Sequence, residues 1–282
     1  MWIRVCCLSA ALLLGSGCST QALLADALAT QGQSDEDDLQ LAREASAFYL
    51  KLSESVLREQ PGHGRLATAV SGGFTQYAYA FVAFEAERLE SQDAKAAKAL
   101  RSRAARLYAR AQGHALRALE AQRPGFAKAL ATPAGPALAP EQVGLAYWGA
   151  AAWAAHISLS KDQPDLVADL PLALRLAQLA WGREPGFGDG DLASLMGTLE
   201  MARPGGQRAQ AQVYFERARA AGAGRNAGVF VAQAEALAMG DRAEFEALLR
   251  QALVAADAKR DLGNTLMRER AQWLLDTADD RF

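Results

Sequence analysis

The chain contains few side chains whose types and spacing could support catalysis. Its three histidines, His63, His114 and His156, lie in different segments, without the short spacing that binds zinc on one helix. A zinc site could still assemble from distant residues. Ser71 lacks the Gly-X-Ser-X-Gly context of a nucleophile elbow, and residues 222–224 lack the later glycine and lysine of a phosphate loop. We predict no enzymatic activity, no metal and no cofactor.

Cys18 carries the clearest chemical prediction. It follows the apolar residues 12–14 and three small residues, with Arg4 ahead of them, and the apolar run is too short to span a bilayer. This arrangement resembles a bacterial lipobox, in which the cysteine thiol receives a diacylglyceryl group and becomes the mature N-terminus. Gly15 departs from the pattern, because lipoboxes usually carry leucine there. We expect residues 1–17 to be a signal peptide and Cys18 to be acylated, although an ordinary signal peptide cut elsewhere is an alternative.

Composition limits the partners and the source of stability. Cleavage before Cys18 would remove both other cysteines, so the fold cannot depend on disulfides. It would leave 29 basic and 32 acidic residues, and with no basic run nucleic acid is excluded as a partner. By analogy with bacterial lipoproteins, Ser19 favours sorting to the outer rather than the inner membrane. We assign residues 18–39 to the lipid anchor and tether, and residues 40–282 to a single helical domain.

Helical periodicity dominates the chain. Strong helix formers are abundant, and no segment shows sustained two-residue alternation of β-branched residues. Apolar residues recur instead at spacings of three and four, as in Leu41, Ala45, Phe48, Leu52 and Val56. We therefore predict an all-α protein. A serine and four carboxylates at residues 34–38 lack the spaced ligands of a calcium loop and are typical of a helix N-terminus.

Similar breaks separate the helices. Residues 59–63, 122–126 and 183–187 each contain Pro-Gly followed by a ring, at intervals of 63 and 61 residues. Proline and glycine end a helix and turn the chain, and the intervals suit two helical hairpins. Small and large residues at 173–185 and 211–218 resemble the second helix of tetratricopeptide repeats. We predict stacked antiparallel helical hairpins in a degenerate tetratricopeptide-like array, although alanine-rich helices also produce such spacings by chance.

Two helices carry aromatic side chains that could line a cleft. In residues 74–84 the rings form a core stripe, except that Tyr79 points to the other side. Tyr147, Trp148 and Trp153 lie among glycine and alanine residues, which let helices approach closely. Rings beside small residues are typical of pockets for organic ligands and equally of a helical core. Tyr79, Tyr147, Trp148 and Trp153 are the candidate ligand-binding residues.

Several segments, in the same order along the chain, carry a resemblance to a known family. They are Gly73–Val82 with Glu85–Arg88, Tyr147–Trp153, Ile157–Asp162, Leu166–Pro171, Phe187–Gly190, Ala202–Gly206 and Tyr214–Ala218. Together they resemble the T component of TRAP-transporter-associated lipoproteins, the TatT family.

The resemblance implies a lipid-anchored periplasmic protein that assembles as a homotrimer. It further implies association with the solute-binding protein of a tripartite (TRAP) transporter, and a cleft or pore for an apolar small molecule. Only the acylated cysteine, Cys18, transfers to a numbered position. The alternative function is a tetratricopeptide-like envelope scaffold for protein assembly that holds no small ligand.

Overall fold

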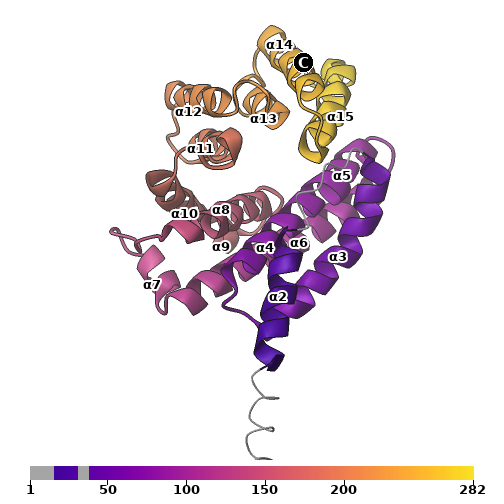
Figure 1. Cartoon of the computed structure of the whole chain (residues 1–282). Coiled ribbons are helices and arrows are strands. Elements are labelled where there is room, and N and C mark those ends of the chain that lie inside the picture. The colour runs from indigo at the N-terminus through magenta and orange to yellow at the C-terminus, as the bar shows by residue number, and fades with distance from the viewer. Residues whose placement is uncertain (1–15, 31–37) are drawn as a thin grey trace, which may run out of the picture.

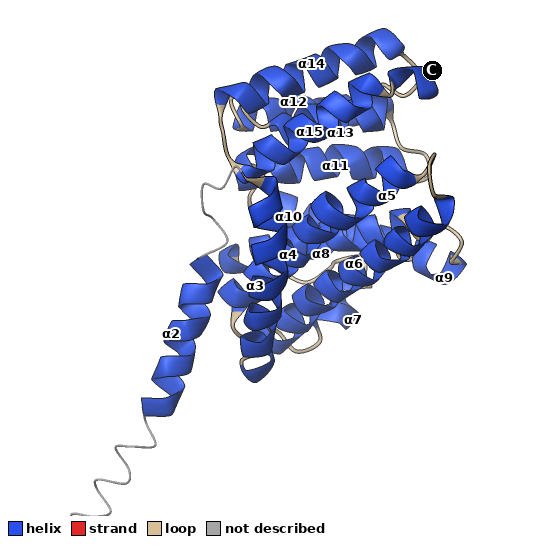
Figure 2. Cartoon of the chain, turned by 90° about the vertical axis from the view of Figure 1, so that its right-hand side faces the viewer, coloured by secondary structure: helices blue, strands red, loops and turns tan. Residues whose placement is uncertain are grey.

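The computed structural model describes residues 16–30 and 38–282, and every regular element in them is helical (Figures 1 and 2). The described residues contain no strand, so the all-α prediction is confirmed. None of their helices is long and apolar enough to cross a membrane. The predicted signal peptide lies outside the described residues except for its last two positions.

The helices have the following bounds. The N-terminal half contains α2 (Ser16–Thr30), α3 (Leu39–Glu59), α4 (Gly64–Ala78), η2 (Tyr79–Ala83), α5 (Phe84–Leu89), α6 (Ala94–Gln122), α7 (Phe126–Leu130), η3 (Pro140–Gln142) and α8 (Val143–Ser158). The C-terminal half contains α9 (Pro164–Val167), α10 (Leu170–Arg183), η4 (Phe187–Gly190), α11 (Asp191–Ala202), α12 (Arg208–Ala221), α13 (Ala227–Leu237), α14 (Arg242–Ala258), α15 (Leu262–Asp276) and η5 (Ala278–Asp280).

Successive hairpins stack into a curved array. The π-helical turn η2 joins α4 to α5, and these helices pack against α6, while α8 packs against α10, α11 against α12 and α13 against α14. The first helices of neighbouring hairpins also touch, α4 with α8 and α11 with α13, and α15 adds to this layer by packing on α13. Figure 1 shows that the stack bends until α15 lies beside α5. This is the predicted arrangement of stacked antiparallel hairpins.

The predicted breaks turn the chain, but their rings differ in role. After α6, Gly125 adopts a φ of +86° and Phe126 is fully buried. His63 instead caps α4, because its Nδ1 accepts a hydrogen bond from the Leu66 amide at 3.1 Å. Asp38 caps α3, because its side chain accepts hydrogen bonds from the backbone amides of Gln40 and Leu41. Capping is therefore confirmed for Asp38, the one residue of the acidic cluster that the structure describes.

Small residues set the distances between the helices. A Cβ atom added at Gly149 of α8 would lie 3.0 Å from the Ala115 side chain of α6, and one added at Gly197 of α11 would lie 2.8 Å from the Phe215 ring of α12. Many of the fully buried residues are alanines. The helices therefore approach closely, and a larger side chain at these glycines would push them apart.

The expected anchor and tether is helical over residues 18–30 and docks on the domain. Ala25 and Leu28 of α2 are buried, and the Tyr49 hydroxyl of α3 donates to the Leu28 carbonyl. Asp26 pairs with Arg65 of α4 at 3.0 Å. The C-terminal half of α2 is thus part of the folded domain.

A buried carboxylate joins α3 to α6. Glu54 is 3% exposed and pairs with Arg110 and with His114 Nε2, the latter at 2.8 Å, while Lys51 approaches it at 2.7 Å. Burial alone would raise the pKa of Glu54, but hydrogen bonds from Arg110, Lys51 and His114 outweigh it and lower the pKa to about 2. The ionised carboxylate is therefore part of the folded structure.

Arg270 closes the curved array. This α15 residue is 4% exposed, and its Nη2 lies 3.0 Å from the Glu87 carboxylate of α5 and 2.6 Å from the Glu235 carboxylate of α13. Its guanidinium also lies over the rings of Tyr79 and Phe84, at 5.3 and 5.2 Å. Residues 87 and 270 are 183 positions apart. One side chain therefore holds the first hairpin against α13 and α15.

We expect Glu54→Gln to lower the free energy of unfolding by about 2–3 kcal/mol at pH 7. The pKa of Glu54 falls from 4.5 to about 2 on folding, so this stabilisation is complete above the unfolded value and is lost as the pH falls toward 2. Denaturant melts at several pH values should show the variant and the parent converging below pH 4. Glu90→Gln, which breaks a largely exposed pair with Arg101, is the control and should change stability little. A constant difference at every pH would contradict the linkage.

Arg270→Met should lower the free energy of unfolding by about 3–5 kcal/mol, because it leaves two carboxylates facing each other without their shared cation. Hydrogen exchange should accelerate in α5 and α15 together. Arg268→Met is the matched control, since Arg268 lies on the same helix with 54% of its side chain exposed. Equal effects from the two substitutions would show that Arg270 does not close the array.

Candidate functional site

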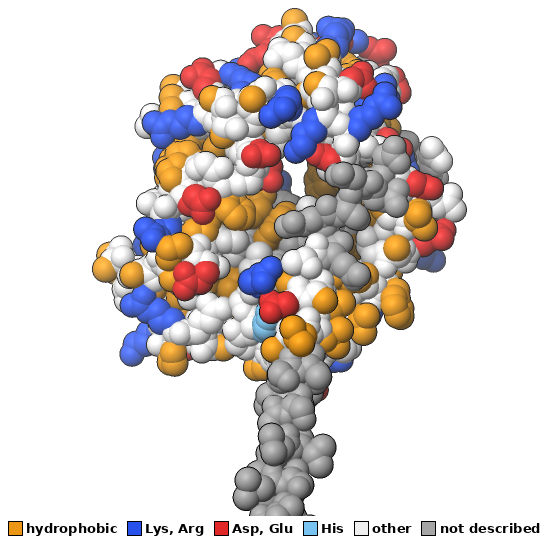
Figure 3. Space-filling view, in the orientation of Figure 1, with side chains coloured by type: hydrophobic (Ala, Val, Ile, Leu, Met, Phe, Trp, Pro, Cys, Tyr) orange, Lys and Arg blue, Asp and Glu red, His pale blue; other side chains and the backbone are white. Residues whose placement is uncertain are grey.

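The centre of the array is hollowed on the face shown in Figure 3, with hydrophobic side chains gathered on the lower side of the opening and charged side chains above it. In Figure 1 the helices around this position are α8, α11, α13, α15 and α5. Helix α8 contributes a line of half-exposed residues at helical spacing, Gly144, Trp148, Ala151 and Ala155. This line is turned away from the side on which Gly149 packs against α6 and α10. We call Gly144, Trp148, Ala151 and Ala155 the α8 inner line.

One aromatic cluster stands at the start of the α8 inner line. The Tyr147 ring lies 4.7 Å from Trp148 and 5.2 Å from Phe187, measured between centroids. The Trp148 indole rests on α4, where a Cβ atom added at Gly72 would be 2.7 Å from it. Tyr147 is buried, whereas Trp148 is half-buried. Trp148 is therefore fixed in position and still presents part of its ring.

Polar groups lie behind this cluster. Burial, together with the charge of Asp191, raises the pKa of Tyr147, so its hydroxyl remains protonated. Burial also raises the pKa of Asp191, whose Oδ1 accepts a hydrogen bond from Asn226 Nδ2 at 2.8 Å. These groups join the beginning of α11 to the loop before α13 and hold the aromatic cluster from one side.

A left-handed turn presents Phe187 to this cluster. Gly188, Asp189 and Gly190 have φ values of +68°, +50° and +99° in succession. Gly190 has no room for a side chain, because an added Cβ atom would lie 2.2 Å from the Ala218 carbonyl oxygen. Asp189 accepts a conformation that costs a non-glycine residue about 1–2 kcal/mol. Phe187 belongs to a segment that carries the family resemblance but was not one of the predicted ligand-binding residues.

The other two predicted site residues lie elsewhere. Trp153 is 5% exposed within the main core, and its indole nitrogen has no acceptor among the described residues. Tyr79 lies in η2 beside Arg270. The structure thus brings Tyr147 and Trp148 together with Phe187, and leaves Tyr79 and Trp153 apart from them. Ala155, at the far end of the α8 inner line, packs against the hydrophobic cluster that includes Tyr79.

Arg270, Glu87 and Glu235 form a polar cluster at the other end of the α8 inner line from the aromatic cluster. None of the three was predicted as a site residue. Arg270 Nη1 is buried without a partner in the described residues. Burial raises the pKa of both Tyr79 and its neighbour Tyr108, so both hydroxyls stay protonated. The sequence held no local signal for this cluster, because its members lie on η2, α5, α6, α13 and α15.

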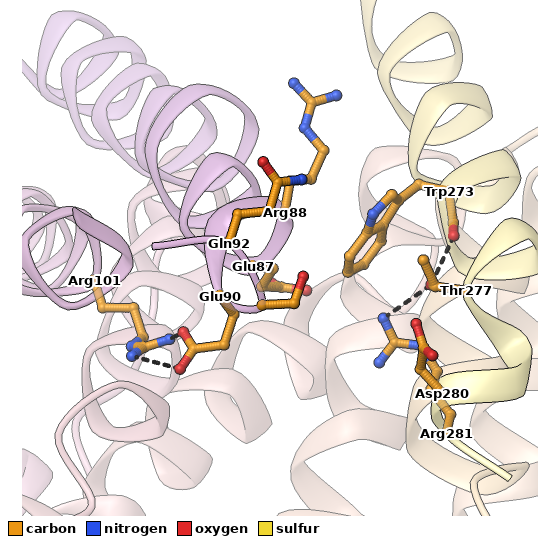
Figure 4. Close-up of a pocket in the computed structure, with 10 residues that line it drawn as sticks. Glu87, Arg88, Glu90, Gln92, Arg101, Trp273, Thr277, Asp280 and Arg281 are labelled. Carbon is orange, nitrogen blue, oxygen red and sulfur yellow. Dashed lines mark hydrogen bonds and ion pairs between the residues drawn. The ribbon is translucent and has the colours of Figure 1, made fainter. Parts of the chain in front are cut away.

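A pocket of about 480 Å³, lined mainly by charged and polar residues, opens at the junction of α5 and α15. Figure 4 shows Trp273 facing the gap, with Glu87 and Glu90 across from Arg281. Arg101 and Glu90 form an ion pair at its edge. Its lining residues are Glu87, Arg88, Glu90, Ser91, Gln92, Arg101, Trp273, Thr277, Asp280 and Arg281. Because charged groups of both signs line it, this pocket does not suit an apolar ligand.

The histidines do not converge. His63 caps α4, His114 pairs with Glu54, and His156 lies on α8 with its Nδ1 unpartnered among the described residues. Burial lowers the pKa of both His114 and His156, which favours their neutral forms. Within residues 16–30 and 38–282, no group of three or more histidine, cysteine, aspartate or glutamate residues is placed to hold a metal ion.

Comparisons with known proteins identify the family of this chain. Residues 35–282 match the family described as the TRAP transporter T-component. The chain is also similar to an uncharacterised protein of Treponema pallidum (strain Nichols), with 27% identity over an alignment that covers 99% of this chain and 98% of the relative. The family match includes every helix from α3 to α15, and with it the aromatic cluster and the Arg270 cluster. The chain therefore belongs to the TRAP transporter T-component family.

Proposed function

We propose that this protein docks the solute-binding protein of a TRAP transporter in the periplasm and holds a small apolar organic ligand against the inner face of its array. The family is one of transport accessory components, and its TRAP association indicates the cell envelope. Docking and ligand holding are inferred from the surface around the hollow, to which the α8 inner line contributes. The observation that carries it is Trp148, a large ring that is rigidly seated on Gly72 and yet half-exposed.

The chemistry of the inner face suits a small apolar molecule. Along the α8 inner line the only large side chain is Trp148, and Gly144, Ala151 and Ala155 add no polar side chains. Pockets for organic ligands combine apolar walls with a few fixed polar groups, and Tyr79 with Arg270 offers such groups beyond Ala155. Binding there needs no catalytic group, in keeping with an accessory component rather than an enzyme.

Docking of the solute-binding protein rests on the family and on the curvature of the array. Stacked helical hairpins present extended concave surfaces, which repeat proteins use for protein partners. A ligand held in the hollow would be accessible to a partner seated across its opening (Figure 3). Docking and ligand holding are thus parts of one function.

Acylation of Cys18 would place this array at a membrane surface. Helix α2 spans Ser16–Thr30, and among its residues 22–30, whose burial is described, Ala25 is the first that is buried. The acyl chains would therefore lie about two helical turns from the folded body, at about 1.5 Å per residue. We propose a lipid-anchored protein, on the outer rather than the inner membrane, that assembles as a homotrimer as its family resemblance implies.

Trp148→Ala should weaken binding of the neutral apolar probe N-phenyl-1-naphthylamine by about tenfold while the fold persists, because it removes an exposed ring face. Trp153→Ala is the matched comparison on the same helix and should lower the free energy of unfolding by about 3–5 kcal/mol, because Trp153 is 5% exposed. Fluorescence titration and denaturant melts measure the two effects. If both variants lose binding only in proportion to lost stability, Trp148 belongs to the core and the ligand proposal fails.

A pull-down tests the docking function. The Cys18→Ala chain should leave the membrane fraction, because it lacks the acyl acceptor, and should enrich a TRAP solute-binding protein from periplasmic extract. Quantitative mass spectrometry of the captured proteins is the readout, and the same beads without the chain are the control. Capture of only cell-wall or outer-membrane assembly proteins would refute docking and favour the scaffold function.

A further inference from the structure

Helix α3 carries a second apolar face that points away from the array. Leu41, Phe48 and Leu52 are 52%, 74% and 40% exposed, and Ala45 between them is also exposed. Their spacing of four, three and four residues places all four on one side of the helix. We call these four residues the α3 stripe. Hydrophobic side chains gather over α2 and α3 at the lower right of Figure 3.

The opposite side of α3 already serves the core. Ala42, Leu50 and Leu57 are buried there, and Glu54 makes its ion pairs with α6. The α3 stripe is therefore additional to the packing that holds α3 in place. In the described residues, ten large hydrophobic side chains are exposed, and five of them lie on α2 and α3, including Leu23 and Leu24. A concentration of this kind is typical of an interaction surface.

We propose that the α3 stripe is the contact between copies of this chain, with the α3 helices of neighbouring copies running parallel around a shared axis. A stripe at spacings of four and three is the seam along which helices pair with their own kind. Its borders favour such pairing, since Glu44 and Lys51, of opposite charge, occupy one edge and no charge interrupts the stripe. Identical copies would thus meet without net repulsion.

The anchor fixes the parallel orientation, and this step rests on the proposed acylation of Cys18. Copies held in one leaflet are related by rotation about the membrane normal, so equivalent helices point the same way. Helix α3 runs beside α2, which leads from the anchor into the domain (Figures 1 and 2). Helix α3 runs back toward the anchored end, so the α3 stripe lies on the side of the molecule that a neighbouring anchored copy can reach (Figures 1 and 2). A helix lying in the membrane surface would instead carry a polar face rich in lysine and arginine.

Confinement on the membrane compensates for a small contact. The α3 stripe covers 11 helical steps, about 16 Å of helix at 1.5 Å per residue. One such stripe buries less area than the roughly 800 Å² per partner of a standard stable interface. Anchoring in two dimensions raises the local concentration of copies and lets a modest surface assemble. We therefore expect assembly to be stronger in membranes than for the acyl-free chain.

Cysteine cross-linking of the full-length lipoprotein in native membranes tests this interface. With Cys18 acylated, Ala45→Cys introduces the one free thiol of the mature chain, and mild oxidation should yield a disulfide-linked pair of identical chains. Val254→Cys is the control, because Val254 is 71% exposed on the distant helix α14. Its cross-linked fraction should be at least tenfold lower. Phe48→Glu added to Ala45→Cys should abolish the cross-link, whereas Val254→Glu should not, with thermal melts confirming folding.

Other outcomes overturn the proposal in distinguishable ways. A membrane-bound chain that does not cross-link through position 45 refutes the α3 interface and leaves the anchor intact. A soluble chain that still cross-links refutes acylation and keeps the interface. A cross-link to a different protein would assign the α3 stripe to that partner. A thiol at position 45 that reacts with lipid-soluble but not water-soluble maleimide would assign the stripe to the bilayer.

Discussion

The ion pairs of Arg270 are the contact on which the shape of this protein depends. A stack of helical hairpins is held mainly by contacts between neighbouring hairpins, and these contacts alone do not bring its two ends together. Arg270 joins α5, α13 and α15 through two carboxylates and two aromatic rings, across 183 residues of sequence. Substituting one member of a buried cluster of this kind leaves uncompensated charge, so the closed arrangement is sensitive to the loss of Arg270. This closure brings α15 beside α5 at one side of the hollow (Figure 1).

Close helix packing supplies the rest of the geometry. Alanine and glycine bring α8 against α6 and α10, which leaves its large side chains to be accommodated on the other sides. Trp148 rests on Gly72 for the same reason, because only a residue without a side chain leaves room for the indole. The half-exposed ring of Trp148 is thus a consequence of how the helices approach one another. A ligand surface and a tightly packed core can therefore share one helix.

Much of the fold could be predicted from the sequence because its determinants are local. Periodicity, Pro-Gly breaks and capping residues specify where helices begin and end, as at Asp38 and Gly125. The site was only partly predictable. Tyr147 and Trp148 are adjacent in sequence, whereas Phe187 reaches them through a left-handed turn, and Arg270 meets Glu87 only because the stack curves. No local pattern encodes curvature, which accumulates from small rotations between hairpins. Periodicity also could not tell that the α3 stripe faces outward, since both faces of α3 repeat at helical spacing.

The three proposed functional regions can be used at the same time without blocking one another. The proposed anchor, Cys18, lies near the start of α2, the α3 stripe lies on the next helix, and the hollow opens among helices that follow later in the chain (Figure 1). Contacts between copies along α3 would use the side of the molecule nearest the anchor and leave the hollow uncovered. A partner could then reach the inner face of each copy in an assembled group. Glu54 joins α3 to α6 while Arg270 joins α15 to α5, so the two sets of ion pairs share no side chain. Anchoring, assembly and ligand holding can thus occur in the same molecule at once.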